Sequence, residues 1–124
     1  METICAAVRE ITDLTLEAFL NDNEKATATI EPLEEIVDVL KNTLRTRHIK
    51  RLQQGQCSIE LGFVWSDLLN NLERVSDHCS NIAVCLMEMN RSEMNPHEAL
   101  RVFRSDSVDF KNNLKIFQEK YALD

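Results

Sequence analysis

The stretch that decides the fold is "LGFVWSDLLNNLERVSDHCSNIAVCLMEM", from Leu61 to Met89. Its apolar residues recur at alternating intervals of three and four, the spacing of a helix that packs against other helices. They are Leu61, Trp65, Leu68, Leu72, Val75, Cys79, Ile82, Leu86 and Met89. The pattern predicts one long helix, roughly over residues 58–90, with this stripe turned inward. We expect its share of the core to include Leu61, Trp65, Leu68, Leu72, Val75 and Ile82.

Three further segments show the same apolar spacing and predict three further helices. They run from Ile4 to Ala18, from Ala26 to Leu44 and from Leu100 to Tyr121. No segment alternates with the period of two that a half-buried strand would show. Only two Gly and two Pro interrupt the chain, which also favours long helices. The sequence therefore predicts an all-α, antiparallel helical bundle, in a single domain over residues 1–124.

Helix-boundary signals agree with this division. "NDNE", residues 21–24, offers a capping side chain with a Glu three residues later. Gly55 is a helix stop and Ser58 is a cap for the long helix that follows. "NPHE", residues 95–98, combines Asn as cap, Pro in the first turn and Glu at the third position, so it marks the start of the last helix.

Charge and composition narrow the classes of partner. The formal net charge is −7, with 21 Asp and Glu against 14 Lys and Arg. Nucleic acid is therefore not expected as a partner, because phosphate contacts need concentrated positive charge. No run of about 18 apolar residues predicts a transmembrane segment, and no signal peptide is visible. The four cysteines form no C-x-x-C motif, so we expect reduced thiols in a cytosolic chain.

Two pairs of carboxylates stand out on the predicted helices. Glu34 and Asp38 are one turn apart, as are Glu73 and Asp77, a spacing at which like charges repel by roughly 0.2–0.5 kcal/mol. Each pair belongs to a polar column along its helix. The columns are Glu31, Glu34, Asp38 and Asn42, and Asn70, Glu73, Asp77 and Asn81. If the two helices are neighbours, four carboxylates converge on a cation.

Carboxylate oxygens suit Mg²⁺, Mn²⁺, Ca²⁺ or ferric iron, and zinc is a further candidate. The sequence thus indicates a metal site at Glu34, Asp38, Glu73 and Asp77. The polar groups expected around this site are Glu31, Asn70, His78 and Asn81. The alternative is that both columns are solvated faces, balanced by ordinary ion pairs with neighbours such as Lys41 and Arg74.

Enzymatic function receives little support. None of the histidines His48, His78 and His97 follows a Glu by three residues, so the ligands of a di-iron oxidase bundle are missing. The chain contains no G-x-S-x-G motif and no phosphate-binding glycine loop. We therefore expect no enzyme, and a metal-dependent hydrolase of phosphate compounds is the weakest of the functions considered.

"RTRHIKR", residues 45–51, is the basic cluster of this acidic chain. One interpretation is that its cations stabilise the C-terminal end of the second helix through the helix dipole. The other is a docking patch for an acidic partner or an anionic membrane surface. The candidate contacts are Arg45, Arg47, Lys50 and Arg51.

Three stretches carry a family resemblance. They are "IEPLEEIVDVL" at residues 30–40, "HIKRLQQGQCSIELGFVWSDLLNNLERVSDHCSNIA" at 48–83 and "FQEKYAL" at 117–123. Together they resemble the PhoU-like region at the C-terminal end of bacterial sodium/phosphate cotransporter family proteins. The resemblance implies a three-helix PhoU-like unit followed by an additional C-terminal helix. It also implies that the two E-x-x-x-D motifs bind multinuclear clusters of iron or zinc.

The resemblance implies a cytoplasmic regulatory domain linked to phosphate uptake, at the inner face of the membrane as part of a transporter or bound to one. Its expected partners are the membrane domain of a phosphate transporter or that transporter's regulators. A full PhoU protein has two three-helix units and this chain shows one, so we also expect a homo-oligomer. The alternative function is a structural helical module for interaction or oligomerisation, with no metal site.

Overall fold

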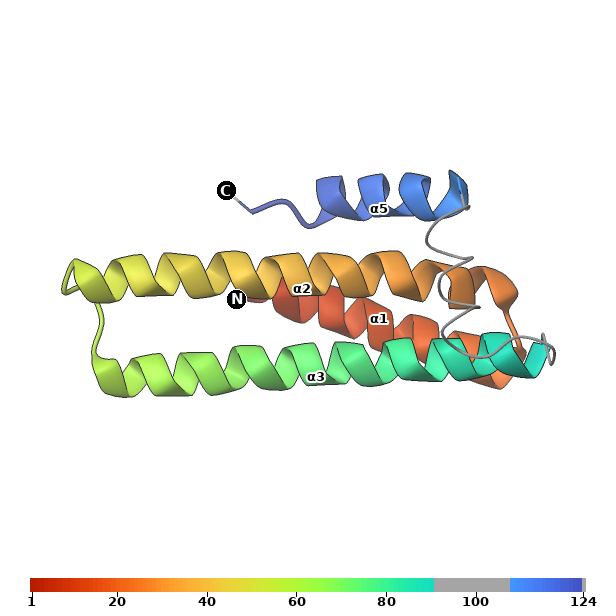
Figure 1. The fold of residues 1–124 in the computed structure, drawn as a ribbon, viewed down its shortest axis with the longest axis horizontal. Helices are drawn as coiled ribbons and strands as arrows, with labels where there is room; N and C mark the ends of the chain where they lie inside the picture. The colour runs from red at the N-terminus through yellow and green to blue at the C-terminus, as the bar shows by residue number, and fades with distance from the viewer. Residues whose placement is uncertain (91–107, 124) are drawn as a thin grey trace.

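The structure is a computed structural model that describes residues 1–90 and 108–123, and its regular elements there are all α-helices. They are α1 (Glu2–Asn21), α2 (Glu24–Gln53), α3 (Ile59–Asn90) and α5 (Val108–Lys120). Helices α1, α2 and α3 alternate in direction, and α5 lies along α2 on the side away from α3 (Figure 1). The prediction of an all-α antiparallel bundle, a three-helix unit followed by one more helix, is confirmed.

The two short connections lie at the predicted boundaries, but the cap of α2 is not the predicted residue. Asn21, three residues before Glu24, is the last residue of α1. The side chain of Asn23 caps α2 instead, by accepting hydrogen bonds from the backbone N–H groups of Lys25 and Ala26 at 3.1 and 3.2 Å. Gly55 follows α2 with a φ of 69°, a conformation that favours glycine. Ser58 Oγ then accepts from the N–H of Leu61 at 3.2 Å at the start of α3. The start signal predicted at residues 95–98 lies outside the described residues.

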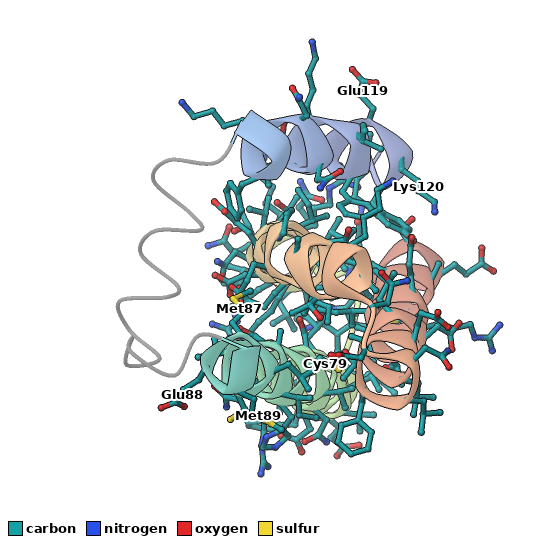
Figure 2. The ribbon with its side chains drawn as sticks, turned by 90° about the vertical axis from the view of Figure 1, so that its right-hand side faces the viewer. Cys79, Met87, Glu88, Met89, Glu119 and Lys120 are labelled. Atoms are coloured by element: carbon teal, nitrogen blue, oxygen red, sulfur yellow. The ribbon has the colours of Figure 1, made fainter. Side chains whose placement is uncertain are left out.

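Helix α2 is the centre of the bundle, since α1, α3 and α5 all pack against it (Figure 2). It continues as one helix through Pro32. Its predicted apolar stripe is confirmed, because each member is buried. These residues are Ala26, Ile30, Leu33, Val37, Leu40 and Leu44. The stripes of α1 and α5 also point inward, and their buried members are Ile4, Ala7, Ile11, Ala18, Phe110, Phe117 and Tyr121.

The predicted inward face of α3 was wrong for four of its six core residues. Leu61 is 65% exposed and Leu68, Val75 and Ile82 are each 40–41% exposed, while Trp65 and Leu72 are half-buried. The buried residues of α3 lie mostly one position further along the chain. They are Gly62, Leu69, Ser76, Cys79, Ala83 and Met87. Figure 2 shows Cys79 between α3 and α1, and Met89 on the far side of α3.

Residue size explains this rotation. Gly62, Ser76 and Ala83 are small, and small residues at the contact allow neighbouring helices to approach closely. A Cβ added to Gly62 would lie 2.8 Å from Nε2 of His48 in α2, which shows how close the two helices come at this point. Small residues therefore occupy several of the buried positions of α3, beside Leu69 and Met87, while large residues such as Leu61 and Leu68 lie on its exposed flank.

The helices differ in length, and this leaves one end of the bundle thin. Helices α2 and α3 have 30 and 32 residues, whereas α1 has 20 and α5 has 13. Consequently the turn between α2 and α3 projects beyond both α1 and α5 (Figure 1). We call residues 45–64, which surround this turn, the hairpin tip. Within residues 1–90 and 108–123, no helix combines the length and the apolar character needed to cross a bilayer.

Candidate functional site at the interface of α2 and α3

Three side-chain contacts join the polar columns of α2 and α3. Lys41 forms an ion pair with Glu73, Arg45 donates a hydrogen bond to Asn70 Oδ1 at 3.0 Å, and Ser80 donates to Glu31. The two columns are therefore adjacent, as expected from their sequence positions. We call this line of polar side chains the acidic seam. Its carboxylates are Glu31, Glu34, Asp38, Glu73 and Asp77.

The same contacts fix the register of the acidic seam. Helices α2 and α3 run in opposite directions, with Glu31 opposite Ser80 and Lys41 opposite Glu73. The residues between these two points, Glu34 and Asp38 on α2 and Asp77 on α3, therefore lie at similar levels along the bundle. Glu34, Asp38 and Glu73 are half-buried and Asp77 is exposed. The four motif carboxylates thus lie along one stretch of the paired helices α2 and α3.

Lys41 offsets part of the electrostatic repulsion between the carboxylates of the acidic seam. Its side chain is 13% exposed and that of its partner Glu73 is 23% exposed, so the pair is largely screened from water. A cation held between two acidic columns offsets the repulsion between carboxylates one turn apart. The sequence placed Lys41 only as a neighbour of Asp38 on its own helix. Its contact across to α3 required the three-dimensional structure.

The residues predicted around the four carboxylates have different environments. Glu31 is fully buried and accepts the hydrogen bond from Ser80, and Asn70 accepts the one from Arg45. His78 and Asn81 are exposed. Glu31 and Asn70 therefore belong to the ordered part of the acidic seam. Ser80 was missed from the sequence, although it lies three residues after Asp77 on the same side of α3.

The acidic seam offers few ligands to any single metal ion. In the described parts of the chain, no three His, Cys, Asp or Glu side chains come close enough together to hold one ion. The described residues of one copy therefore do not gather the ligands of a multinuclear cluster. An E-x-x-x-D pair offers two carboxylates, which is enough for an ion that keeps several waters, as Mg²⁺ does. Such an ion at Glu73 would compete with Lys41.

The basic cluster lies near the end of α2. Arg45, Arg47 and Lys50 are exposed, and Arg51 is half-buried with its guanidinium 5.5 Å from the centroid of the Trp65 ring. A pocket of about 360 Å³ opens beside it between α2 and α3. Its lining residues are Arg45, His48, Ile49, Leu52, Ile59, Gly62, Phe63, Trp65, Ser66 and Leu69. This end of the bundle is thus both basic and apolar.

Helix α5 is tied to α1 at the opposite side of the molecule from α3. The hydroxyl of Tyr121 donates to the carboxylate of Glu10, which also pairs with Lys120 at 2.7 Å. Burial, followed by the hydrogen bond and the negative charge of Glu10, raises the pKa of Tyr121 well above its usual value of 10.0. Tyr121 therefore remains a neutral donor far into alkaline pH.

The family model described as "PhoU domain" matches residues 1–86, which include α1, α2 and most of α3, and the chain belongs to the PhoU domain family. A relative is the "Phosphate-specific transport system accessory protein PhoU homolog 1" of Thermotoga maritima, 26% identical over 66 residues. The aligned part covers 53% of this chain and 28% of the relative. No solved structure matches the chain.

Proposed function

We propose that the chain is a cytoplasmic regulatory domain that controls phosphate uptake and catalyses no reaction. The observation that carries this proposal is the match of residues 1–86 to the PhoU domain. The name of the Thermotoga relative, an accessory protein of a phosphate-specific transport system, supports it. That relative is much longer than the segment aligned to it, so its role as a whole protein is extended to this chain only as a proposal.

The transporter that we propose as its partner is a sodium/phosphate cotransporter. The support is the resemblance of residues 48–83 to the C-terminal region of that family. The partner is then the cotransporter's membrane domain or one of its regulators. Removal of the chain from its cell should change the rate of phosphate uptake, and restoring it should reverse the change. Unchanged uptake would contradict the proposal, and phosphatase turnover by the purified chain would contradict a purely regulatory role.

We also propose that the acidic seam binds metal ions through its two E-x-x-x-D pairs, with iron or zinc suggested by the family resemblance. The support is that Glu34, Asp38, Glu73 and Asp77 lie along one stretch of the paired helices α2 and α3, where none of the four is fully buried. The ion would supply further positive charge to this line of carboxylates, beside Lys41. For Glu73 to act as a ligand, its ion pair with Lys41 must open.

The metal proposal can be tested with a pair of matched double variants. Glu73→Gln with Asp77→Asn removes two charges from the seam. Glu60→Gln with Asp67→Asn removes the same two charges from exposed positions elsewhere on α3. Elemental analysis of protein purified without chelator or metal-affinity tag should show metal lost from the first variant and kept by the second. Metal should also raise the melting temperature of the second variant but not of the first. Equal metal content in wild type and both variants would contradict the site.

A second function, oligomerisation, is favoured by one specific observation. Leu68, Val75 and Ile82 are spaced seven residues apart along α3 and each is 40–41% exposed. A seven-residue apolar repeat is the pattern by which one helix packs lengthwise on another. We therefore keep the prediction of a homo-oligomer. The mass in solution, measured by light scattering, should fall to that of a monomer on Val75→Lys with Ile82→Lys. A wild-type chain that is monomeric at all concentrations would contradict it.

A further inference from the structure

The positive charge of this acidic chain is concentrated at one end. The hairpin tip, residues 45–64, contains four Lys and Arg and one Glu, whereas the remainder of the chain holds ten Lys and Arg against 20 Asp and Glu. Lys50 and Arg51 lie in the last turn of α2, where the helix dipole accounts for them. Arg45 and Arg47 lie further back, beyond the reach of that effect. The helix dipole therefore does not explain the whole cluster.

The first turns of α3, beside this basic cluster, expose large apolar side chains. Ile59 and Phe63 are 70% exposed, Leu61 is 65% exposed and Val64 is 64% exposed. Successive residues lie about 100° apart around a helix, so Ile59 and Phe63, one turn apart, share one side of α3, whereas Leu61 and Val64 point to other sides. The exposed Glu60 lies between these two groups, so this end of α3 is amphipathic. An amphipathic helix end with exposed Phe and Ile suits surroundings that are apolar on one side and polar on the other, as at the boundary of a bilayer.

The position of these residues in the fold allows such surroundings. The hairpin tip projects beyond α1 and α5, so it can meet a flat surface end-on without interference from either helix (Figure 1). Ile49 adds another apolar side chain, 47% exposed, at the end of α2. Trp65, an amphipathic side chain of the type that favours the lipid–water boundary, lies behind them, with Arg51 over its ring.

We propose that the hairpin tip docks end-on onto a bilayer surface that contains anionic lipids. Arg47, Lys50 and their neighbours would contact the headgroups, while Ile59 and Phe63 would enter the boundary between headgroups and acyl chains. The acidic remainder of the chain would be repelled by the same surface, which orients the molecule with its tip toward the membrane. This inference does not depend on the role in phosphate uptake or on metal.

Lipid vesicles test the proposal directly. The full chain should bind vesicles containing phosphatidylglycerol at least tenfold more tightly than vesicles of pure phosphatidylcholine, and added salt should weaken the binding. Trp65 is the single tryptophan and directly follows the tip in the sequence, so brominated lipids should quench its fluorescence. Equal binding to neutral and anionic vesicles, or no binding to either, would overturn the proposal.

Matched variants distinguish binding through the hairpin tip from a general effect of the net charge of the chain. Arg47→Glu with Lys50→Glu should reduce binding to anionic vesicles at least tenfold. Lys111→Glu with Lys115→Glu makes the same charge change at exposed positions on α5 and should bind like wild type. Ile59→Ser with Phe63→Ser should keep the helical circular dichroism and lose the quenching of Trp65. Equal losses in the tip and α5 charge variants would overturn docking through the tip.

A protein partner for the same cluster would give a different result. If the tip contacts an acidic protein instead of lipid, the chain will associate with that protein in detergent but will not bind protein-free vesicles. That outcome overturns the lipid proposal and leaves the regulatory function intact. Conversely, the chain could bind vesicles through its tip while cells lacking it take up phosphate at an unchanged rate. That result would support membrane docking and contradict the role in phosphate uptake.

Discussion

Lys41 of α2 forms an ion pair with Glu73 of α3 within a seam that carries four further carboxylates. Those four are Glu31, Glu34, Asp38 and Asp77. The ammonium group supplies positive charge where carboxylates on two helices face one another, so it favours the association of α2 with α3. It also occupies one carboxylate that the metal proposal requires. One residue is therefore expected to influence both folding and metal binding.

Replacing Lys41 with Met should lower the stability of the metal-free chain. The change leaves Glu73 partly buried without its cation, which should reduce the free energy of unfolding by about 1–3 kcal/mol. Urea denaturation in the presence of chelator measures it. The double variant Lys41→Met with Glu73→Gln should recover most of the loss, because the unpaired charge is gone. A single variant as stable as wild type would show that the ion pair contributes nothing.

The same Lys41→Met substitution should strengthen metal binding. An ion approaching Glu73 no longer competes with the ammonium group, and the seam carries one more net negative charge. We expect the apparent dissociation constant to fall about tenfold, which corresponds to about 1.4 kcal/mol. Calorimetric titration of the chain with the metal alone measures this. Weaker binding in the variant would mean that Lys41 organises the site and does not compete for it.

Two adjacent leucines test the orientation of α3. Leu69 is 1% exposed and Leu68 is 41% exposed, although the two residues are chemically identical. Leu69→Ala should lower the free energy of unfolding by about 2–5 kcal/mol, since it leaves a cavity in the core. Leu68→Ala should cost about 1 kcal/mol or less, in proportion to its smaller buried area. Urea unfolding of both variants measures the difference, and equal losses would contradict the observed orientation.

The same region shows where prediction from the sequence ends. The helical spacing of apolar residues correctly predicted an all-α fold, and the large apolar residues of α2 correctly predicted its buried face. In α3 the large residues gave the wrong face. Gly62, Ser76 and Ala83 carry little or no hydrophobic signal, yet their small size allows the closest helix contacts. A pattern that weights residues by hydrophobicity cannot identify positions selected for small volume.

The candidate site was predicted only in part, because the sequence shows the spacing within each helix but not the contacts between helices. The spacing of charged residues within each helix showed two acidic columns, and the structure brings them together. Which cation crosses between α2 and α3 depends on the register of the two helices, which spacing within one helix does not define. Lys41 and Ser80 therefore entered the site only through their contacts with Glu73 and Glu31.

Gly62→Ala should destabilise the chain even though alanine is the better helix former. The added methyl group would lie 2.8 Å from His48 Nε2, and this imidazole is buried with its ring next to Trp65. The clash should outweigh a gain in helix propensity of about 1 kcal/mol and leave a net loss of about 1–2 kcal/mol. Thermal unfolding measures the change. In a His48→Ala background the same substitution should be neutral or stabilising, and a similar loss there would rule out the clash.

Tyr121 should make the stability of the chain fall at high pH. Its pKa is raised in the folded state by burial and by Glu10, so below pH 10 the phenol is neutral in both states and its contribution is complete. Above about pH 10 the unfolded state loses the proton first, and stability should fall by up to 1.4 kcal/mol per pH unit, roughly. Tyr121→Phe should remove this component of the slope, as measured by urea unfolding from pH 9 to 11. Parallel slopes in both proteins would contradict the assignment.

The unequal lengths of the helices also define a gradient of local opening along the bundle. Near the middle, α2 is enclosed by three neighbours, whereas the hairpin tip consists of α2 and α3 alone (Figure 1). Backbone amides there can exchange with deuterium through openings that disturb only one helix pair, while amides around Leu33 and Val37 require opening of the whole bundle. The chain therefore joins a slowly exchanging body to an end that can change its shape at low cost, so a contact made at the tip can be formed and released without unfolding the acidic seam.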